Sequence, residues 1–397
     1  MYVNVYAINM DYFPIILITL ILLLAFTRVI TVAIHEMGHA LAGLILLRGN
    51  ISIYIGSYGD PKKGIHFRIG RLKVHFKYNP LLWNYGLCVS NPTQTTLLRH
   101  YLVTLAGPLA SLITTFICLF LLIDPHPHSA IKIMAIFLFF SSVLDFLQNI
   151  RPDENPIVLH DGSITYNDGQ TLKLLKSYKG VYKEIITLTE YYSNNKIKEG
   201  IKCFEDMYSE KKDINLLRVG INIYMKDENY EKARELFNQL QTMATLTDND
   251  YCIYALAYSY SEEHSKALAL YDTSLKINPK NFYSLNNRGY TLNLMGQYEH
   301  AIKDFDEAIE LNPKFAYAYN NRGLSKIKTG NEKDGLDDIK KSMQLDDKNS
   351  YAYKNLGIYH KEKGELARAM EFFHKAREID PKTHGLKDLI TETENQM

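Results

Sequence analysis

Two histidines and a glutamate near the start of the chain have the spacing H-E-x-x-H. They are His35, Glu36 and His39. Residues four positions apart share one face of a helix, so the two imidazoles can bind one metal ion while the intervening carboxylate takes a proton from water. The pattern therefore predicts a zinc-dependent hydrolytic site, with His35 and His39 as Zn²⁺ ligands and Glu36 as the catalytic base.

The segment that carries this pattern is long and apolar. Residues 13–47 would form a helix of roughly 50 Å, whereas the hydrocarbon core of a bilayer is about 30 Å thick. We therefore expect a membrane-spanning helix that either tilts and emerges or breaks near Gly38 or Gly43. We do not expect a cleaved signal peptide, because no basic residue precedes Arg28 and the apolar character continues past any cleavage point.

Arg28 lies two helical turns before His35, on the same face of the expected helix. Its charge could face the metal site or a substrate path. It could instead reach the membrane interface or a hydrogen-bond partner, as arginines in apolar helices commonly do, and we favour this second interpretation.

Two more segments have the length and composition of membrane spans. Residues 102–123 carry no charge, and residues 131–150 carry only Lys132 and Asp145. Eight Lys and Arg residues lie between the first and second spans, whereas the turn 124–130 contains none. The positive-inside rule then places the chain's start outside and puts the HEMGH end of the first span and everything after residue 150 in the cytoplasm.

The segment between the first two spans alternates apolar and polar residues. The alternation covers residues 50–55 and 65–76, with a turn signal at 59–61 between them. This pattern predicts a cytoplasmic β-hairpin with a bulge near Gly70. The edge of the hairpin could hold an extended substrate peptide, or the hairpin could lie at the lipid interface.

Composition divides the chain of 397 residues into an apolar part and a charged, aromatic part. We place a membrane domain at residues 1–180 and a soluble domain at 181–397. The net charge of +1 argues neither for nor against nucleic acid, but no Lys/Arg block suggests a binding arm, so we expect no nucleic-acid partner. The four cysteines lack C-x-x-C spacing, so we expect buried thiols rather than a metal or redox site.

The second part has an internal period of 34 residues. The residues that keep this period are Pro279, Pro313 and Pro381; Gly289, Gly323 and Gly357; and Ala233, Ala267, Ala301 and Ala369. This pattern of small residues in a helix-turn-helix unit resembles the tetratricopeptide repeat, most clearly at 282–315. The period predicts an α-solenoid of about six units over residues 181–397.

Such an array predicts a cytoplasmic protein or peptide partner. The first helix of each unit is expected to line the binding face. The side chains expected there are Tyr283, Asn286, Tyr290, Tyr317, Asn320, Tyr351 and Lys354. The array could instead serve folding or oligomerisation, and the sequence does not identify a ligand.

The metal site needs one more protein ligand, because a catalytic zinc usually has three and keeps one position open. The residues downstream of the histidines offer Asp145, Asp161 and Asp168. Asp168 precedes Gly169 and a helix-like apolar pattern, whereas Asp161 precedes a β-prone segment.

Three motifs occur in order along the first part. They are H-E-x-x-H in the first span, A-G-P-L-A-S at 106–111 in the second, and Asn149-x-x-Pro152 followed by Asp-Gly after the third. Together they resemble the site-2 protease family of intramembrane zinc metalloproteases, peptidase family M50. The resemblance covers about residues 13–180.

The resemblance implies a zinc ion held by His35, His39 and Asp168, with Glu36 as general base. One feature departs from the family pattern. The family often has Asn-Pro-Asp-Gly in a compact turn, whereas here 18 residues separate Asn149 from Asp168. Asn167-Asp168-Gly169 fits a longer variant of the motif better than the Asp-Gly pair at Asp161 does.

The predicted fold is an all-α membrane protein with about three transmembrane helices and a β-hairpin, fused to the repeat solenoid. The predicted function is hydrolysis of peptide bonds in membrane-embedded protein substrates, with the repeats recruiting a substrate or partner. The alternative is a catalytically silent scaffold anchored in the lipid bilayer. Against the alternative, imidazole and carboxylate side chains are costly to keep in lipid without a role.

Overall fold

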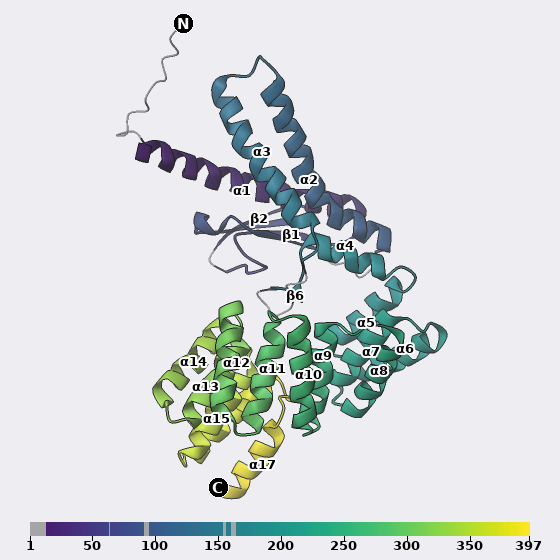
Figure 1. Cartoon of the computed structure of the whole chain (residues 1–397), viewed down its shortest axis with the longest axis vertical. Coiled ribbons are helices and arrows are strands. Elements are labelled where there is room, and N and C mark those ends of the chain that lie inside the picture. The colour runs from purple at the N-terminus through teal and green to yellow at the C-terminus, as the bar shows by residue number, and fades with distance from the viewer. Residues whose placement is uncertain (1–12, 63, 91–94, 154–155, 160–163) are drawn as a thin grey trace. The chain divides into compact units, whose positions relative to one another are not determined.

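The chain divides into two units, Met1–Glu190 and Tyr191–Met397 (Figure 1). The first unit thus ends ten residues after the boundary expected at residue 180. The computed structural model describes residues 13–62, 64–90, 95–153, 156–159 and 164–397.

Three long helices dominate the first unit: α1 (Phe13–Leu46), α2 (Leu97–Ile123) and α3 (Ser129–Ile150). Each is long and apolar enough to cross a membrane. The expected alternative of a break near Gly38 or Gly43 is wrong, because α1 continues through both glycines. In Figure 1, α2 and α3 form an antiparallel pair joined by a short turn.

The second long helix begins earlier than the expected residue 102. Its N-cap is Thr96, whose side chain accepts a hydrogen bond from the backbone N–H of Arg99. This cap satisfies one of the free N–H groups of the first turn, so the polar residues before the apolar run join the helix.

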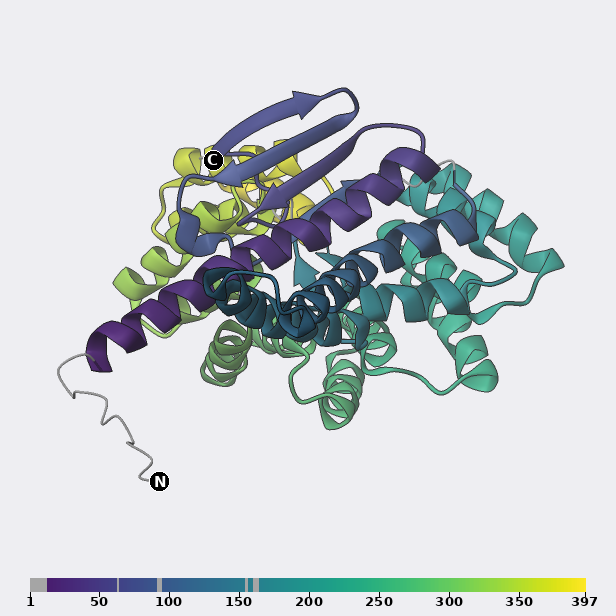
Figure 2. The same cartoon turned by 90° about the horizontal axis from the view of Figure 1, so that it is seen from above.

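A four-stranded sheet lies on the side of α1 opposite to α2 and α3 (Figure 2). Its strands are β1 (Ile51–Ile55), β2 (Gly64–Ile69), β3 (Leu72–Lys77) and β4 (Gly86–Ser90), in the order β2-β3-β1-β4. Alternate residues of β1 are buried, and they pack with Val32 and Ala40 of α1 in one apolar cluster. The sheet therefore supports the helix that carries the H-E-x-x-H pattern.

The expected hairpin between residues 50–55 and 65–76 is wrong. The second of these segments is itself the hairpin β2–β3, which turns at Gly70–Arg71, and β3 pairs with β1 in parallel. The cause is burial. Leu72 and Val74 of β3 are buried against the β1 cluster, whereas Ile65, Phe67 and Ile69 of β2 are exposed, so β3 takes the inner position.

A short linking region follows α3. It contains a two-stranded sheet of β5 (Ile157–Val158) and β6 (Ile164–Thr165), and then α4 (Asp168–Ser177). The helix α5 (Tyr182–Ser193) runs through the boundary between the units.

The second unit continues with α6 (Ile197–Glu210), then five helix pairs, and ends with α17 (Leu386–Gln396). The five pairs are α7 (Ile214–Lys226) with α8 (Tyr230–Met243), α9 (Asp248–Tyr260) with α10 (His264–Ile277), α11 (Phe282–Leu294) with α12 (Tyr298–Leu311), α13 (Ala316–Lys328) with α14 (Glu332–Leu345), and α15 (Ser350–Glu362) with α16 (Leu366–Ile379).

The periodic small and aromatic residues form the core of these pairs. Ala301 and Phe305 of α12 are fully buried, and so are Ala369 and Phe373 of α16, which stand in the same phase of the repeat. Leu386 of α17 packs against the α16 residues and covers the apolar end of the array. An array of repeats needs such a cap, because each repeat buries its apolar face only against a neighbour.

The four expected buried thiols differ in exposure. Cys118 and Cys252 are buried, whereas Cys88 and Cys203 are half-buried. All four are free cysteines.

Candidate metal centre

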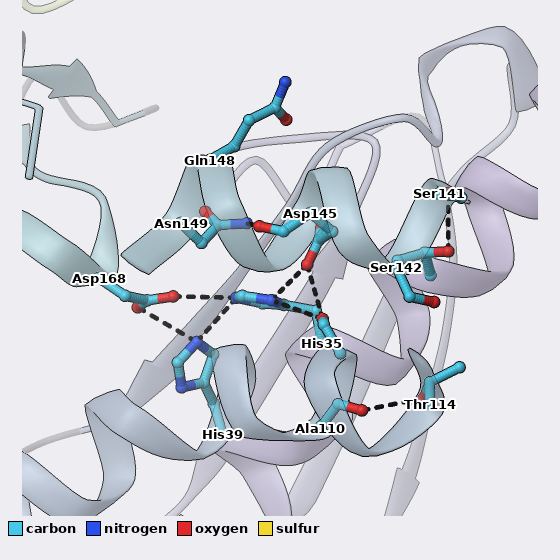
Figure 3. A network of polar contacts seen from close by, with 12 residues as sticks. His35, His39, Ala110, Thr114, Ser141, Ser142, Asp145, Gln148, Asn149 and Asp168 are labelled. Carbon is cyan, nitrogen blue, oxygen red and sulfur yellow. Dashed lines mark hydrogen bonds and ion pairs between the residues drawn. The ribbon is translucent and has the colours of Figure 1, made fainter. Parts of the chain in front are cut away.

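The first unit brings His35, His39 and Asp168 together at one point (Figure 3). The Nε2 atoms of the two histidines lie 3.2 Å apart. The carboxylate of Asp168 lies 3.0 Å from Nε2 of His35 through Oδ2 and 3.2 Å from Nε2 of His39 through Oδ1. All three residues are largely buried.

The other ring nitrogen of each histidine faces an acceptor. Nδ1 of His35 lies 2.7 Å from Oδ2 of Asp145, and Nδ1 of His39 lies 2.8 Å from the carbonyl oxygen of Val103. These partners assign the proton of each neutral imidazole to Nδ1. Both Nε2 atoms then present lone pairs to each other and to Asp168, so three acceptors converge with no donor among them.

Such a cluster suits a divalent cation. With zinc–ligand bonds of about 2.0–2.1 Å in tetrahedral geometry, two ligand atoms lie about 3.3 Å apart. The separations of 3.0–3.2 Å in this cluster are close to that value. Two imidazoles and one carboxylate also form a typical donor set for catalytic zinc. The residues present therefore fit a zinc ion.

Asn167 positions Asp168 at the start of α4. Its side-chain oxygen accepts from the backbone N–H of Gln170, and its amide nitrogen donates to the carbonyl oxygens of Gln148 and Arg151. The cap of α4 is thus attached to the C-terminal end of α3. Gly169 permits this contact, since a Cβ there would lie 2.4 Å from the carbonyl oxygen of Ile150.

Gly107, in the A-G-P segment of α2, keeps space for the imidazoles. A Cβ at this position would lie 2.2 Å from Nε2 of His39 and 2.7 Å from Nε2 of His35. Any side chain at position 107 would therefore occupy the place where the histidine nitrogens converge.

Of the other aspartates considered from the sequence, Asp145 does not join this cluster. Asp145 lies on the opposite side of the His35 ring from Asp168 (Figure 3). Asp161 lies outside the described residues. Asn149 lines the cleft beside the cluster, and its amide donates to the backbone oxygen of Asp145.

Asp145 is a residue next to the cluster whose position the sequence did not reveal. It is 1% exposed and accepts hydrogen bonds from Nη1 of Arg28 at 2.6 Å and from Oγ of Ser111 at 2.7 Å, besides its contact with His35. Arg28 thus has a hydrogen-bond partner, as in the interpretation that we favoured. This partner, Asp145, also contacts His35 of the cluster. Residues from α1, α2 and α3 meet in this network.

The cluster opens into a cleft of about 270 Å³ that is also lined by Glu36 and by strand β4. Glu36 is 7% exposed, and its carboxylate lies beside the backbone of Gly86 at the start of β4. In the described part of the sheet, β4 pairs only with β1. The cleft therefore contains a carboxylate and the edge of a strand next to the three converging acceptors.

Four of the seven side chains expected to bind a partner in the second unit are buried within the chain, whereas Tyr317 is exposed. Asn286, Tyr290, Asn320 and Lys354 are buried. His384, in the loop before α17, stacks on Tyr260 at 4.4 Å between ring centroids. Its Nδ1 lies 2.8 Å from the hydroxyl of Tyr290, and Nζ of Lys354 donates to its carbonyl oxygen at 3.0 Å.

Residues 282–315 match the family model of the tetratricopeptide repeat. The chain therefore contains this repeat, as its 34-residue period predicted. Among curated proteins, anaphase-promoting complex subunit 3 of Schizosaccharomyces pombe is similar, with 25% identity over 35% of this chain. The aligned region covers only 25% of that relative.

Solved structures with similar folds include other tetratricopeptide repeat proteins. One from Parabacteroides merdae is 19% identical and covers 57% of this chain and 92% of its own, with a TM-score of 0.47. YrrB, described as a TPR protein with an unusual peptide-binding site, is 16% identical and covers 49% of this chain and 96% of its own, with a TM-score of 0.35. None of these similarities bears on a protease.

Proposed function

We propose that the first unit is a zinc-dependent peptidase that acts on membrane-embedded proteins, and that the repeat unit recruits a protein or peptide partner. The observation that carries the proposal is the convergence of two imidazole nitrogens and one carboxylate within 3.0–3.2 Å of one another. Without a cation, these acceptors would repel one another in a buried site. The motifs that resemble the site-2 protease family support the same function.

His35, His39 and Asp168 would hold the zinc ion. When bound, zinc supplies Lewis-acid activation of water and of the peptide carbonyl. Glu36 shares the cleft with these residues and would act as general base, taking the proton of the attacking water and passing it to the leaving amine.

Strand β4 provides a way to hold the substrate. An extended peptide can add to the edge of a sheet through main-chain hydrogen bonds. In this extended conformation its peptide bonds are accessible, whereas in a helix they are not. Because β4 lines the same cleft as Glu36, a peptide paired with it would pass the catalytic residues. The exposed apolar residues of β2 suit the alternative role of the sheet, contact with lipid.

The membrane setting rests on composition. Three helices are long and apolar enough to span a bilayer. The two histidines of the cluster lie on α1, and Asp145 of α3 connects α1 and α2 beside them. The excess of basic residues between the first two helices supports a cytoplasmic position for the sheet and the repeat unit.

The second candidate function is a membrane-anchored repeat scaffold without catalysis. The match of residues 282–315 to the tetratricopeptide repeat favours it, because repeats of this family form binding surfaces. The two candidates share the role of the repeat unit and differ in the first unit alone. A catalytic test of the first unit therefore decides between them.

The test is Glu36→Gln in the full-length protein. The amide keeps the shape of the side chain and loses the base, so we expect cleavage to fall at least about 100-fold while zinc content stays at the wild-type value. The measurement is cleavage of a co-expressed reporter with a single transmembrane segment, and the wild-type enzyme treated with a chelator should lose the same activity.

Asp153→Asn is the matched control, because it makes the same change of carboxylate to amide at an exposed position outside the cleft. It should cleave at the wild-type rate. Equal cleavage by wild type and Glu36→Gln, or no cleavage of any membrane reporter by a zinc-loaded wild type, would favour the scaffold.

A further inference from the structure

The buried network around Asp145 connects all three long helices to one metal-facing imidazole. Asp145 receives hydrogen bonds from Arg28 of α1 at 2.6 Å, from Ser111 of α2 at 2.7 Å and from Nδ1 of His35 at 2.7 Å. A carboxyl group that accepts three such bonds is ionised, since a protonated one would have to donate.

The two histidines differ in this respect. His39 donates its Nδ1 proton to a neutral carbonyl, that of Val103, whereas His35 donates to a carboxylate. A charged acceptor draws the Nδ1 proton more strongly and makes Nε2 of the same ring a better electron donor to a metal. It also prevents the ring from rotating, because rotation would break a charge-assisted bond in a buried site.

Arg28 balances the charge of the site. Glu36, Asp145 and Asp168 carry three negative charges in or next to the cleft, and a divalent cation alone would leave one of them uncompensated. An unpaired charge among apolar helices is strongly unfavourable. With Arg28 bound to Asp145, the zinc-loaded site is neutral.

We propose that Asp145 is a positioning residue that orients His35 and raises its affinity for the metal, and that Arg28 makes this carboxylate tolerable in an apolar surrounding. The inference rests on the proposed zinc site and adds to it two residues that touch neither metal nor substrate. It also gives a role to an Arg and an Asp that lie in largely apolar helices.

The experiment is zinc affinity of the purified full-length chain, measured by competition with a chromophoric chelator. Asp145→Asn keeps an acceptor but loses the charge, and we expect it to bind zinc about 10- to 100-fold more weakly. Arg28→Gln should also weaken binding, and Arg28→Lys should restore most of the affinity.

A second readout separates positioning from general destabilisation. At saturating Co²⁺, the visible absorption bands of the metal report the ligands directly, so Asp145→Asn should shift these bands even when every site is occupied. Ser141→Ala is the matched control. It removes a buried hydrogen bond between α1 and α3, from Thr31 to Ser141 at 2.8 Å, without touching His35, and it should keep the wild-type affinity and spectrum.

The outcomes are distinct. If wild type binds zinc and Asp145→Asn binds it equally well with an unchanged cobalt spectrum, the positioning role is overturned and the zinc site stands. If Ser141→Ala weakens zinc binding as much as Asp145→Asn, the effect is one of helix packing and the inference is also overturned. A folded wild type that binds no zinc overturns the proposed function and this inference together.

Discussion

At the residue scale, the candidate site depends on the two nitrogens of each imidazole having different partners. Nδ1 of each ring faces an acceptor in the protein, and Nε2 faces the point shared with Asp168. The arrangement selects one tautomer of both rings and leaves space at that point, which Gly107 keeps free of side-chain atoms.

Gly107→Ala tests whether this space matters. The added methyl would lie 2.2 Å from Nε2 of His39, so the ring or α2 must move. A displacement of about 1 Å at a catalytic centre can cost about 100-fold in rate, and we expect a loss of that order together with weaker zinc binding.

Gly43→Ala, in α1, is the control for the glycine-to-alanine change. The nearest atom to its added methyl is Cδ1 of Ile51 at 3.0 Å, the end of a flexible side chain. Zinc content and cleavage measured on both variants decide the matter, and wild-type values for Gly107→Ala would show that the histidines do not converge as described.

Sequence predicted some of these residues and missed others for a physical reason. His35 and His39 lie four residues apart in one helix, so their spacing alone places them on one face, and the same motif identifies Glu36. The proposed role of Asp145 depends on how α3 packs against α1, which no local spacing encodes. The sequence marks Asp145 only as a carboxylate in an apolar segment, and such a carboxylate is a candidate metal ligand.

At the scale of elements, the sheet shows the same limit. Alternation marked the segments that became β1, β2 and β3, but it did not specify which strands pair. The interruption of the alternation at Gly70 fits both a bulge within one strand and a turn between two strands. The structure has the turn, because the β3 residues are buried in the cluster with α1. Strand β4 had no signal strong enough to predict it, although it lines the cleft.

The repeat unit provides a prediction about pH. Burial and the charge of Lys354 lower the pKa of His384 to about 4, with smaller effects of Asp388 and His264. The unfolded chain, with a pKa near 6.5, then binds more protons than the folded one between these values. Stability is therefore full above about pH 6.5 and falls as the pH decreases toward 4, by no more than about 2 kcal/mol at pH 5.

The measurement is the melting temperature of the repeat unit in the full-length chain, monitored through amide hydrogen exchange of α9, α11 and α15. A drop of about 4–8 °C is expected between pH 7.5 and pH 5. His384→Asn should lose most of this dependence, because asparagine does not titrate in the range. His374→Ala, at an exposed position of α16, should retain it. An unchanged pH dependence in His384→Asn would refute the assignment.

At the scale of the whole molecule, the chain combines a helical unit with a candidate metal centre and a repeat unit. The 34-residue period predicted the second unit well, because a repeat encodes its own neighbour contacts in every copy. The first unit was predicted from apolar lengths and motifs, which locate helices but not their mutual packing. For that reason, the bounds of its three long helices lie closer to the expected spans than its sheet and its polar network lie to the expected ones.

Topology is the prediction that belongs to this scale. The basic-residue distribution places the turn between α2 and α3 outside and the repeat unit in the cytoplasm. In a cysteine-free background, an impermeant thiol reagent applied to intact cells should label Pro127→Cys and not Glu299→Cys, which is exposed on α12. The reverse labelling would mean that the candidate metal centre opens to the other side of the membrane.

The most direct test of the central claim is the zinc content of the purified full-length protein, measured by mass spectrometry of the metal in wild type and in Asp168→Ala. We expect about one zinc per chain in the wild type and a large loss in Asp168→Ala, because three protein ligands hold a catalytic zinc and the variant keeps two. Asp153→Ala, an exposed aspartate in the same linking region, should keep the metal. A folded wild type without zinc, or an Asp168→Ala variant with wild-type zinc content, would contradict the account.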